Sequence, residues 1–537
     1  MKRHLFTWLM LLVTLYGKAQ GKECFGLFTD RDLYTSGETM LLKAFAPSAV
    51  QGGILTVDLF NAKGEMIASV PLQISDNQAD GFLSLNDTLS SGSYLLRVLT
   101  QTSVTQTVKE LYILNRFTGV TESGISFRPA AAISTPDSIQ PLFTVSGAEK
   151  NYKRREKAHL TIHFPADWMA LTEGPLCLYV AQAIPEYNAQ TFVLNHKPKF
   201  SSNAGNEGII ISGIATDPAT STPFKNGVIT LSVPDSLPRF NYYTTGENGR
   251  FYFQLKDYHG RISLVLNGND PTNYRPMKIS LDKQENLLSS LPPFKTGIFP
   301  PELRKVAAKN VEALNFSKIF KQQQISVLPA KISKTDAYPF YGVPERVIYP
   351  KLFVDLSNFE EISRELLQGI KFRDNNHHPT FQILNAQRNS FFTEQPLVLL
   401  NGVPVRNLND IKDLGSREID RIEISQYERY FGNLRFSGVV AIYAPKFDFE
   451  GLKESDDLIK LSLDAVQPRA VFNPAPNDQA KEPDLRQVLL WQPILKPETT
   501  IGVDFQTSDI IGKFRVVISG KRRDGRLFFK EQSFEVN

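Results

Sequence analysis

Histidine pairs are the first residues of this chain whose spacing could support chemistry. His159 and His163 are four positions apart in an alternating apolar stretch that predicts a strand, so they share one face. Such a pair could ligate a metal ion. Because no acidic or cysteine partner is evident beside them, we expect both to face solvent. His377 and His378 lie in a polar loop over residues 373–379 and are expected to be solvated.

Catalytic motifs are missing from the sequence. It contains no Gly-x-Ser-x-Gly elbow, no His-Glu-x-x-His pair and no Walker loop. We therefore predict no catalytic, cofactor-binding or metal-binding residues, and a protein that is not an enzyme. An envelope hydrolase stays open as an alternative, which would require two carboxylates or a nucleophile and a base converging in a cleft.

The chain has two cysteines, Cys24 and Cys177. They could pair in an oxidising compartment. The apolar run around Cys177, from Leu176 to Val180, favours a buried cysteine within a strand instead. No Cys-x-x-Cys or cysteine–histidine spacing indicates zinc.

Charge gives no case for nucleic acid as a partner. The chain has 60 basic and 56 acidic residues, a formal net charge of +4 over 537 residues. The basic runs 153–155 and 522–523 are expected to be solvated turns. A composition of 42% hydrophobic residues, with 33 glycines and 33 prolines spread along the chain, favours many short strands and turns.

The N-terminus predicts export. Lys2 and Arg3 precede a short apolar run over residues 5–16, and small residues follow within 17–20. This pattern is typical of a secretory signal peptide and is too short for a membrane span. Cys24 follows Gly-Lys-Glu instead of the small residues that a lipoprotein signal needs, so lipidation is not expected. We therefore predict a protein of the cell envelope, in the periplasm or at the outer membrane.

Two similar segments, 118 residues apart, open successive predicted sandwiches. Tyr34 aligns with Tyr152, and Glu38 with Glu156, each in a polar turn that leads into an alternating strand. This Tyr-x-x-x-Glu-x-x-x-Leu pattern resembles the start of macroglobulin domains, the β-sandwich units of the α2-macroglobulin family. Protease-trapping members of that family carry a Gly-Cys-Gly-Glu-Gln thioester. The sequence lacks this motif, so a covalent trap is not expected.

Short strands at about 8–12-residue spacing with turns between them predict a mainly β fold of tandem macroglobulin- or immunoglobulin-like sandwiches, plus a small α+β plug-like domain. The third sandwich also resembles the carboxypeptidase-regulatory-like family, with an Asn226-Gly227 turn that needs positive φ angles. The predicted segments are a signal peptide (1–20), sandwiches (21–117, 141–200 and 205–285), a helical connector (300–370), the plug-like domain (380–447) and a C-terminal sandwich (465–537).

The segment 395–444 resembles the plug domain of TonB-dependent outer-membrane receptors. Its pattern predicts a strand over 397–400, a turn at Asn401-Gly402, short helices near 409, 416 and 427–431, and strands over 420–424 and 438–443. The bulky run 430–436 departs from receptor plugs, which usually have small residues there. Because the chain ends 93 residues after Ala444, no 22-stranded barrel is expected to follow.

We therefore expect a non-enzymatic envelope protein, similar in its motif order to proteins of the Bacteroidetes envelope. The resemblance implies that the plug-like domain docks on a β-barrel or TonB-linked partner. Asn401, Gly402, Tyr430 and Phe431 are the predicted partner-binding residues. A cell-surface scaffold or adhesin, with the sandwiches as spacers, is the alternative from a different class.

Overall fold

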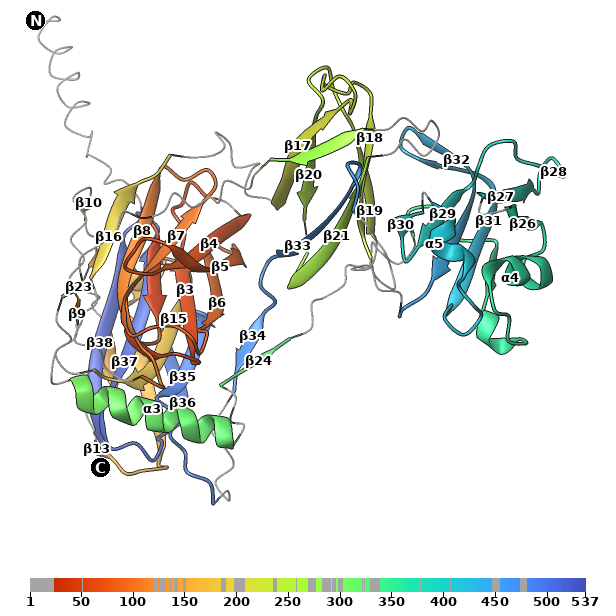
Figure 1. Ribbon diagram of the computed structural model, residues 1–537. Coiled ribbons are helices and arrows are strands. Elements are labelled where there is room, and N and C mark those ends of the chain that lie inside the picture. Colours follow the sequence, from red (N-terminus) through yellow and green to blue (C-terminus); the bar gives the residue numbers. More distant parts are fainter. Residues whose placement is uncertain are drawn as a thin grey trace, which may run out of the picture. The chain divides into compact units, whose positions relative to one another are not determined.

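The computed structural model describes residues 24–50, 52–118, 124–125, 132–134, 138–139, 143–147, 151–184, 190–197, 208–234, 239–256, 258–268, 277–282, 291, 296–297, 303–320, 322, 324–328, 339–375, 378–405, 407–446, 454–473 and 481–537. The predicted signal peptide and His377 lie outside these residues. Strands dominate the described chain, which confirms the mainly β fold class (Figure 1). No described helix is long and apolar enough to cross a membrane.

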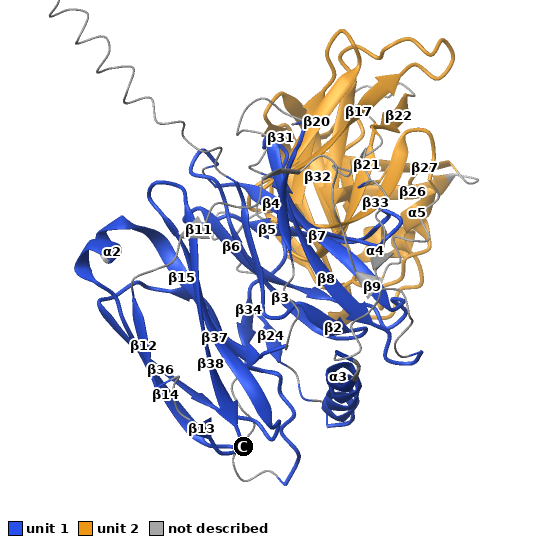
Figure 2. Cartoon of the chain, turned by 90° about the vertical axis from the view of Figure 1, so that its left-hand side faces the viewer, with its two compact units in different colours: residues 1–208, 286–329, 466–537 blue, residues 209–285, 330–465 orange. Residues whose placement is uncertain are grey.

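The chain forms two compact units, each built from separate stretches of sequence (Figure 2). Unit 1 comprises residues 1–208, 286–329 and 466–537. Unit 2 comprises residues 209–285 and 330–465. The chain therefore leaves unit 1 and returns to it, whereas the predicted domains followed one another along the sequence.

The first sandwich of unit 1 is built by two sheets. One has the order β1-β3-β6, with the bounds Gly26–Thr29, Thr39–Phe45 and Gln78–Ser84. The other has the order β10-β16-β8-β7-β4-β5, with β2 pairing parallel to β8; these strands are Ala132–Ser134, Thr191–Asn195, Thr105–Leu114, Gly92–Thr100, Ile54–Phe60, Met66–Gln73 and Leu33–Thr35. Alternate apolar residues of both sheets, including Leu42, Val57 and Leu96, meet in one core.

The second sandwich of unit 1 joins two segments that the sequence analysis assigned to different domains. Its larger sheet has the order β11-β38-β37-β15-β35, with β13 parallel to β38; the strands are Ser138–Ile139, Leu527–Val536, Gly512–Arg522, Thr172–Gln182, Val488–Leu495 and Asn151–Tyr152. Its smaller sheet, β12-β14-β36, comprises Thr144–Ser146, Lys157–His163 and Thr500–Gln506. A short helix, α2 (Ala166–Leu171), precedes β15.

The separate sandwiches predicted at 141–200 and 465–537 are therefore corrected to one. β15 pairs with β35 and β37, and β14 pairs with β36, so neither segment has a complete core alone. β16, predicted within the second sandwich, instead pairs with β8 of the first. Local alternation predicted the strands correctly, but it carries no information about which distant strand supplies the partner.

The repeated opening is confirmed in its geometry. The hydroxyl of Tyr152 donates to the carbonyl of Gly147 at 2.6 Å, and that of Tyr34 contacts Asp30 Oδ1 at 2.8 Å. Glu38 accepts the backbone N–H of Thr35, and Glu156 accepts that of Lys153, which is the same bond shifted by 118 residues. Both tyrosine-bearing strands pair parallel with a long strand of their sandwich, β2 with β8 and β13 with β38.

The predicted connector is divided between the units. Helix α3 (Leu303–Ile319) packs against β2 and β8 of unit 1 through Leu303 and Ala307. The strands β24 (Ile325–Val327) and β34 (Ala470–Phe472) form an antiparallel ribbon where the chain leaves unit 1 and returns. A second short pair in unit 1 joins β9 (Gly124–Ile125) to β23 (Thr296–Gly297).

Unit 2 contains the third sandwich. Its sheets have the orders β20-β17-β22 and β19-β18-β21-β33, with the bounds Arg250–Leu255, Ile209–Thr216, Lys278–Leu281, Arg239–Thr244, Val228–Val233, Arg261–Asn267 and Leu458–Asp464. β33 follows the plug-like segment in sequence and completes this sandwich. At the predicted turn only Asn226 has a positive φ, 55°, and it leads into β18 from a loop instead of closing a hairpin.

The predicted plug-like domain (380–447) and the described end of the predicted helical connector, from residue 339 onward, pack together in unit 2 and are called the plug-like module below; the module has one mixed sheet with helices beside it. The sheet has the order β25-β31-β32-β29-β30, comprising Arg346–Ile348, Arg421–Phe431, Leu434–Tyr443, Leu397–Leu400 and Val403–Pro404. The strands β26, β27 and β28 (Ile370–Asn375, His378–Asn385 and Ser390–Phe391) form a smaller sheet. Helices α4 (Phe359–Leu366) and α5 (Asn409–Lys412) and the 3-10 helix η3 (Pro350–Leu352) complete the segment.

The predicted strands of this segment are confirmed, and two of its predicted helices are wrong. Residues 427–431 continue β31, with a register shift between Ser425 and Glu428, and residues 416–418 form a turn. The apolar residues of these strands form part of the core: Leu397, Leu399, Val403, Ile422 and Ile424 are at most 6% exposed. Helix α4 lies in the predicted helical connector, and the Asn358 side chain caps it by accepting the backbone N–H of Glu361.

Candidate functional site

The histidine pair lies on the exposed face of β14, as expected. His159 Nδ1 is 2.7 Å from Asp504 Oδ1, and His163 Nδ1 is 3.1 Å from Thr500 Oγ1. Sequence reasoning missed Asp504 because β36 supplies it from 345 positions away. Within the described residues, no group of three or more His, Cys, Asp and Glu side chains is placed to hold a metal ion. His378 is exposed at the start of β27.

Cys177 is fully buried on β15, which confirms the prediction of a strand-embedded cysteine. Burial raises the pKa of its thiol to about 12. The thiolate is the reactive form of cysteine, so this side chain is held in its unreactive state at neutral pH. Cys24 is partly exposed near the start of the described chain.

The predicted turn residues Asn401 and Gly402 stabilise the fold. Both are buried and have positive φ angles, 46° and 84°. The Asn401 amide donates to the carbonyl of Ala444 at 2.9 Å, and its oxygen accepts the Ala444 N–H at 2.8 Å. The side chain therefore closes the end of β32 as another strand would, and it presents no surface to a partner.

The bulky run 430–436 is explained by the hairpin between β31 and β32. Its tip packs on β19 of the third sandwich within unit 2. The Phe431 ring lies 5.7 Å from the rings of both Phe240 and Tyr242. The Asn433 N–H donates to the Tyr242 hydroxyl at 2.8 Å. Phe431 is therefore occupied internally, whereas Tyr430, at 63% exposed, remains accessible.

Among the described residues of unit 2, the most exposed run of large apolar side chains lies elsewhere, at residues 352–354. Leu352, Phe353 and Val354 are 79%, 57% and 78% exposed. Three consecutive large apolar side chains at such exposure are unusual on a protein surface and mark interaction sites. Their exposure could not be predicted from the sequence, because an apolar run after a strand is equally typical of a buried strand.

Firm anchors hold this segment at both ends. On its N-terminal side, β25 pairs with β31, and Pro350 is buried at the start of η3. On its C-terminal side, the backbone of Leu356 donates to Ser416 Oγ at 3.0 Å and accepts the Ser416 N–H at 2.9 Å. The exposed side chains are therefore displayed by a fixed backbone, which lowers the entropy cost of binding.

Paired charges surround the exposed segment. Lys351 lies 3.6 Å from Asp420, and Arg417 lies 2.7 Å from Asp355. These exposed pairs add little to stability. They form a polar rim of balanced charge beside an apolar centre, which is the common composition of a protein-binding surface.

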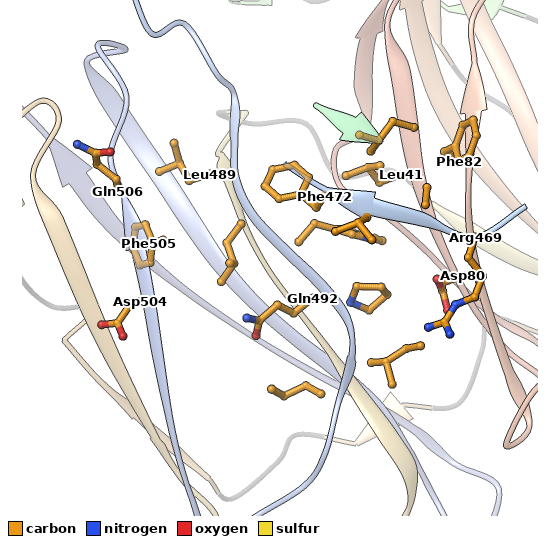
Figure 3. A pocket seen from close by; sticks show the side chains of 18 of the residues that line it. Leu41, Asp80, Phe82, Arg469, Phe472, Leu489, Gln492, Asp504, Phe505 and Gln506 are labelled. Carbon is orange, nitrogen blue, oxygen red and sulfur yellow. The ribbon is translucent and has the colours of Figure 1, made fainter. Parts of the chain in front are cut away.

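A second candidate site is a cavity of about 840 Å3 in unit 1 (Figure 3). Its walls come from β3, β6, β14, β35, β36 and the β24–β34 ribbon. The lining is mostly apolar, and it includes Leu41, Phe82, Ile325, Phe472, Leu489 and Trp491. Charged side chains of both signs, among them Asp80, Lys157, Arg469 and Asp504, also line it. A volume in the range of ligand-binding pockets and a mainly apolar lining are typical of a binding site.

Comparisons with known proteins give no family. No family model matches the chain, and no curated protein matches it. Among solved structures, it is similar to Escherichia coli alpha-2-macroglobulin activated by porcine elastase, with 10% identity and a TM-score of 0.24 over 96% of this chain. Salmonella alpha-2-macroglobulin reacted with methylamine gives 8% identity and a TM-score of 0.23 over 96%.

The chain spans less than half the length of these macroglobulins, 44% and 39%. A repeat from the extending region of a large adhesion protein gives 10% identity and a TM-score of 0.12. Likenesses this distant carry no argument about activity or partners. The plug resemblance rests on the sequence pattern alone.

Proposed function

We propose that this protein is a non-enzymatic interaction protein of the cell envelope, whose plug-like module docks on an outer-membrane β-barrel protein. The observation that carries the proposal is the exposed apolar segment Leu352-Phe353-Val354, held rigidly beside strand β25. The order of strands in the module, which resembles receptor plugs, favours a barrel as the partner. The signal-like N-terminal sequence supports an envelope location.

The segment is large enough to anchor a complex. Fully burying one large apolar side chain contributes about 1.5–3 kcal/mol. Leu352, Phe353 and Val354 together offer roughly three times that amount before the cost of association is subtracted. A few buried aromatic and aliphatic side chains typically dominate an interface of this kind.

The edge of β25 offers a second recognition element. β25 pairs only with β31 among the described strands, and its other side has no ladder partner among them. Val347 on this strand is 41% exposed. An extended segment of the partner could add to this edge through main-chain hydrogen bonds.

Affinity isolation from the source cells tests the proposal. The full chain is used as bait against detergent-solubilised envelope, together with a Leu352→Ser, Phe353→Ser double variant. The matched control is Ile511→Ser, at a site in unit 1 that is 55% exposed. We expect the unchanged chain and the control to recover a β-barrel protein, and the double variant to lose it. Recovery of no barrel protein, or equal recovery by all three chains, contradicts the proposal and favours a scaffold.

A further inference from the structure

The cavity of unit 1 lies between the edges of strands that come from different sheets. β35 is the last strand of its sheet and pairs only with β15 among the described strands. β34 pairs only with β24. The cavity is lined by residues 489–495 of β35 and by residues 469–472 at β34. Two strand edges therefore face one apolar space.

A third strand edge at the cavity, that of β6, is already covered by a side chain, unlike the edge of β35. β6 is the last strand of its sheet, and the Gln467 side chain pairs with it as a neighbouring strand would. The Phe82 N–H donates to Gln467 Oε1 at 2.8 Å, and Gln467 Nε2 donates to the Phe82 carbonyl at 2.7 Å. Gly81 makes room, since a Cβ there would lie 2.5 Å from Gln467 Oε1. No described side chain makes an equivalent clamp on β35.

The side chains around the cavity fit an uncharged apolar segment. Phe82, Ile325 and Phe472 are half-buried, and Trp491 is 7% exposed. The acids Asp80 and Asp504 are balanced by Lys157 and Arg469, so the lining favours neither an anion nor a cation. Pro493 is tolerated within β35 because an edge strand has one side without ladder bonds.

We propose that this cavity binds an extended apolar peptide, which adds as a strand to the edge of β35 and places alternate side chains against Trp491 and the β24–β34 ribbon. Only another peptide backbone can satisfy a row of edge N–H and C=O groups while its side chains fill an apolar space. This site lies in unit 1 and does not depend on the docking surface of the plug-like module.

Tryptophan fluorescence of the full chain tests the inference. The probe is a blocked octapeptide of alternating valine and threonine with one lysine at each end. The matched control peptide is N-methylated at every second residue, which removes backbone donors and keeps the side chains. Trp491 lines the cavity and Trp168 does not. We expect a saturable change in emission that disappears in Trp491→Phe, and a Kd at least tenfold higher for the methylated peptide.

Substitutions on the protein supply the second arm. Ile494, 47% exposed on β35, lines the cavity, whereas Ile511, 55% exposed, does not. We expect Ile494→Lys to raise the Kd at least fivefold and Ile511→Lys to leave it unchanged. Equal affinity for both peptides, or no saturable change at 1 mM peptide (about −4 kcal/mol of binding), overturns the inference. The peptide comparison uses the unchanged chain, so it decides the question even if a variant misfolds.

Discussion

Asn401 gives the sharpest test of how the plug-like module is held together. Replacing it by glycine removes both hydrogen bonds to the Ala444 backbone, at 2.9 and 2.8 Å. Glycine adopts the left-handed backbone conformation at this position without steric strain. At about 0.5–1.5 kcal/mol for each bond, Asn401→Gly should destabilise the module by about 1–3 kcal/mol. Asn401→Ala should cost about 1–2 kcal/mol more, because φ is 46° at this position.

Hydrogen exchange of the full chain is the appropriate assay. Both described tryptophans, Trp168 and Trp491, lie in unit 1, so their fluorescence does not report on unit 2. Peptides covering β29 and β32 should exchange fastest in the alanine variant, more slowly in the glycine variant and slowest in the unchanged chain. Asn433→Ala, at an exposed turn of the same unit, is the control and should stay within about 0.5 kcal/mol. If the alanine variant is as protected as the unchanged chain, the Asn401 hydrogen bonds do not stabilise the module.

Three further outcomes concern buried polar groups of unit 1. Burial lowers the pKa of Lys43 below 10.5, so as pH falls below 10.5 the unfolded chain gains a proton before the folded chain does. The protein therefore loses stability between pH 10.5 and the lowered pKa. Lys43→Met should therefore increase the free energy of unfolding at pH 7 by about 1–3 kcal/mol, seen as a higher Tm. This increase should become smaller as pH rises toward 10.5. Cys177, with a pKa near 12, should resist a thiol reagent at pH 8 until the protein is unfolded in urea, as read against Cys177→Ser. Arg97→Met should cost about 3–5 kcal/mol by stranding Asp58, 2.9 Å away, and Asp58→Leu should recover much of that loss in the double variant, measured by urea unfolding.

Local pattern predicted much of the fold. The strand 397–400 and the repeated Tyr-and-Glu opening follow from alternation and turn chemistry, which act within a few residues. The pairing of β15 with β35 and β37 could not be predicted in this way. Hydrophobic alternation specifies which face of a strand is buried and leaves the partner strand open.

The candidate site was predicted less well than the fold. Asn401 and Gly402 were chosen for their turn, and the turn exists, but the Asn401 amide points at Ala444 inside the module. Phe431 was predicted to bind a partner, and its ring instead packs against Phe240 of β19 within unit 2. The exposure of Leu352 to Val354 could not be predicted, because it depends on which elements cover a segment, and the local sequence does not contain that information.

The docking role of the plug-like module is tested most directly by photo-crosslinking in intact source cells. A benzoylphenylalanine replaces Phe353 in one strain and Ile511 in another, and the crosslinked products are identified by mass spectrometry. We expect one dominant adduct from position 353 with an outer-membrane β-barrel protein, and none with that protein from position 511. No adduct from position 353, or the same adducts from both positions, would contradict the docking role.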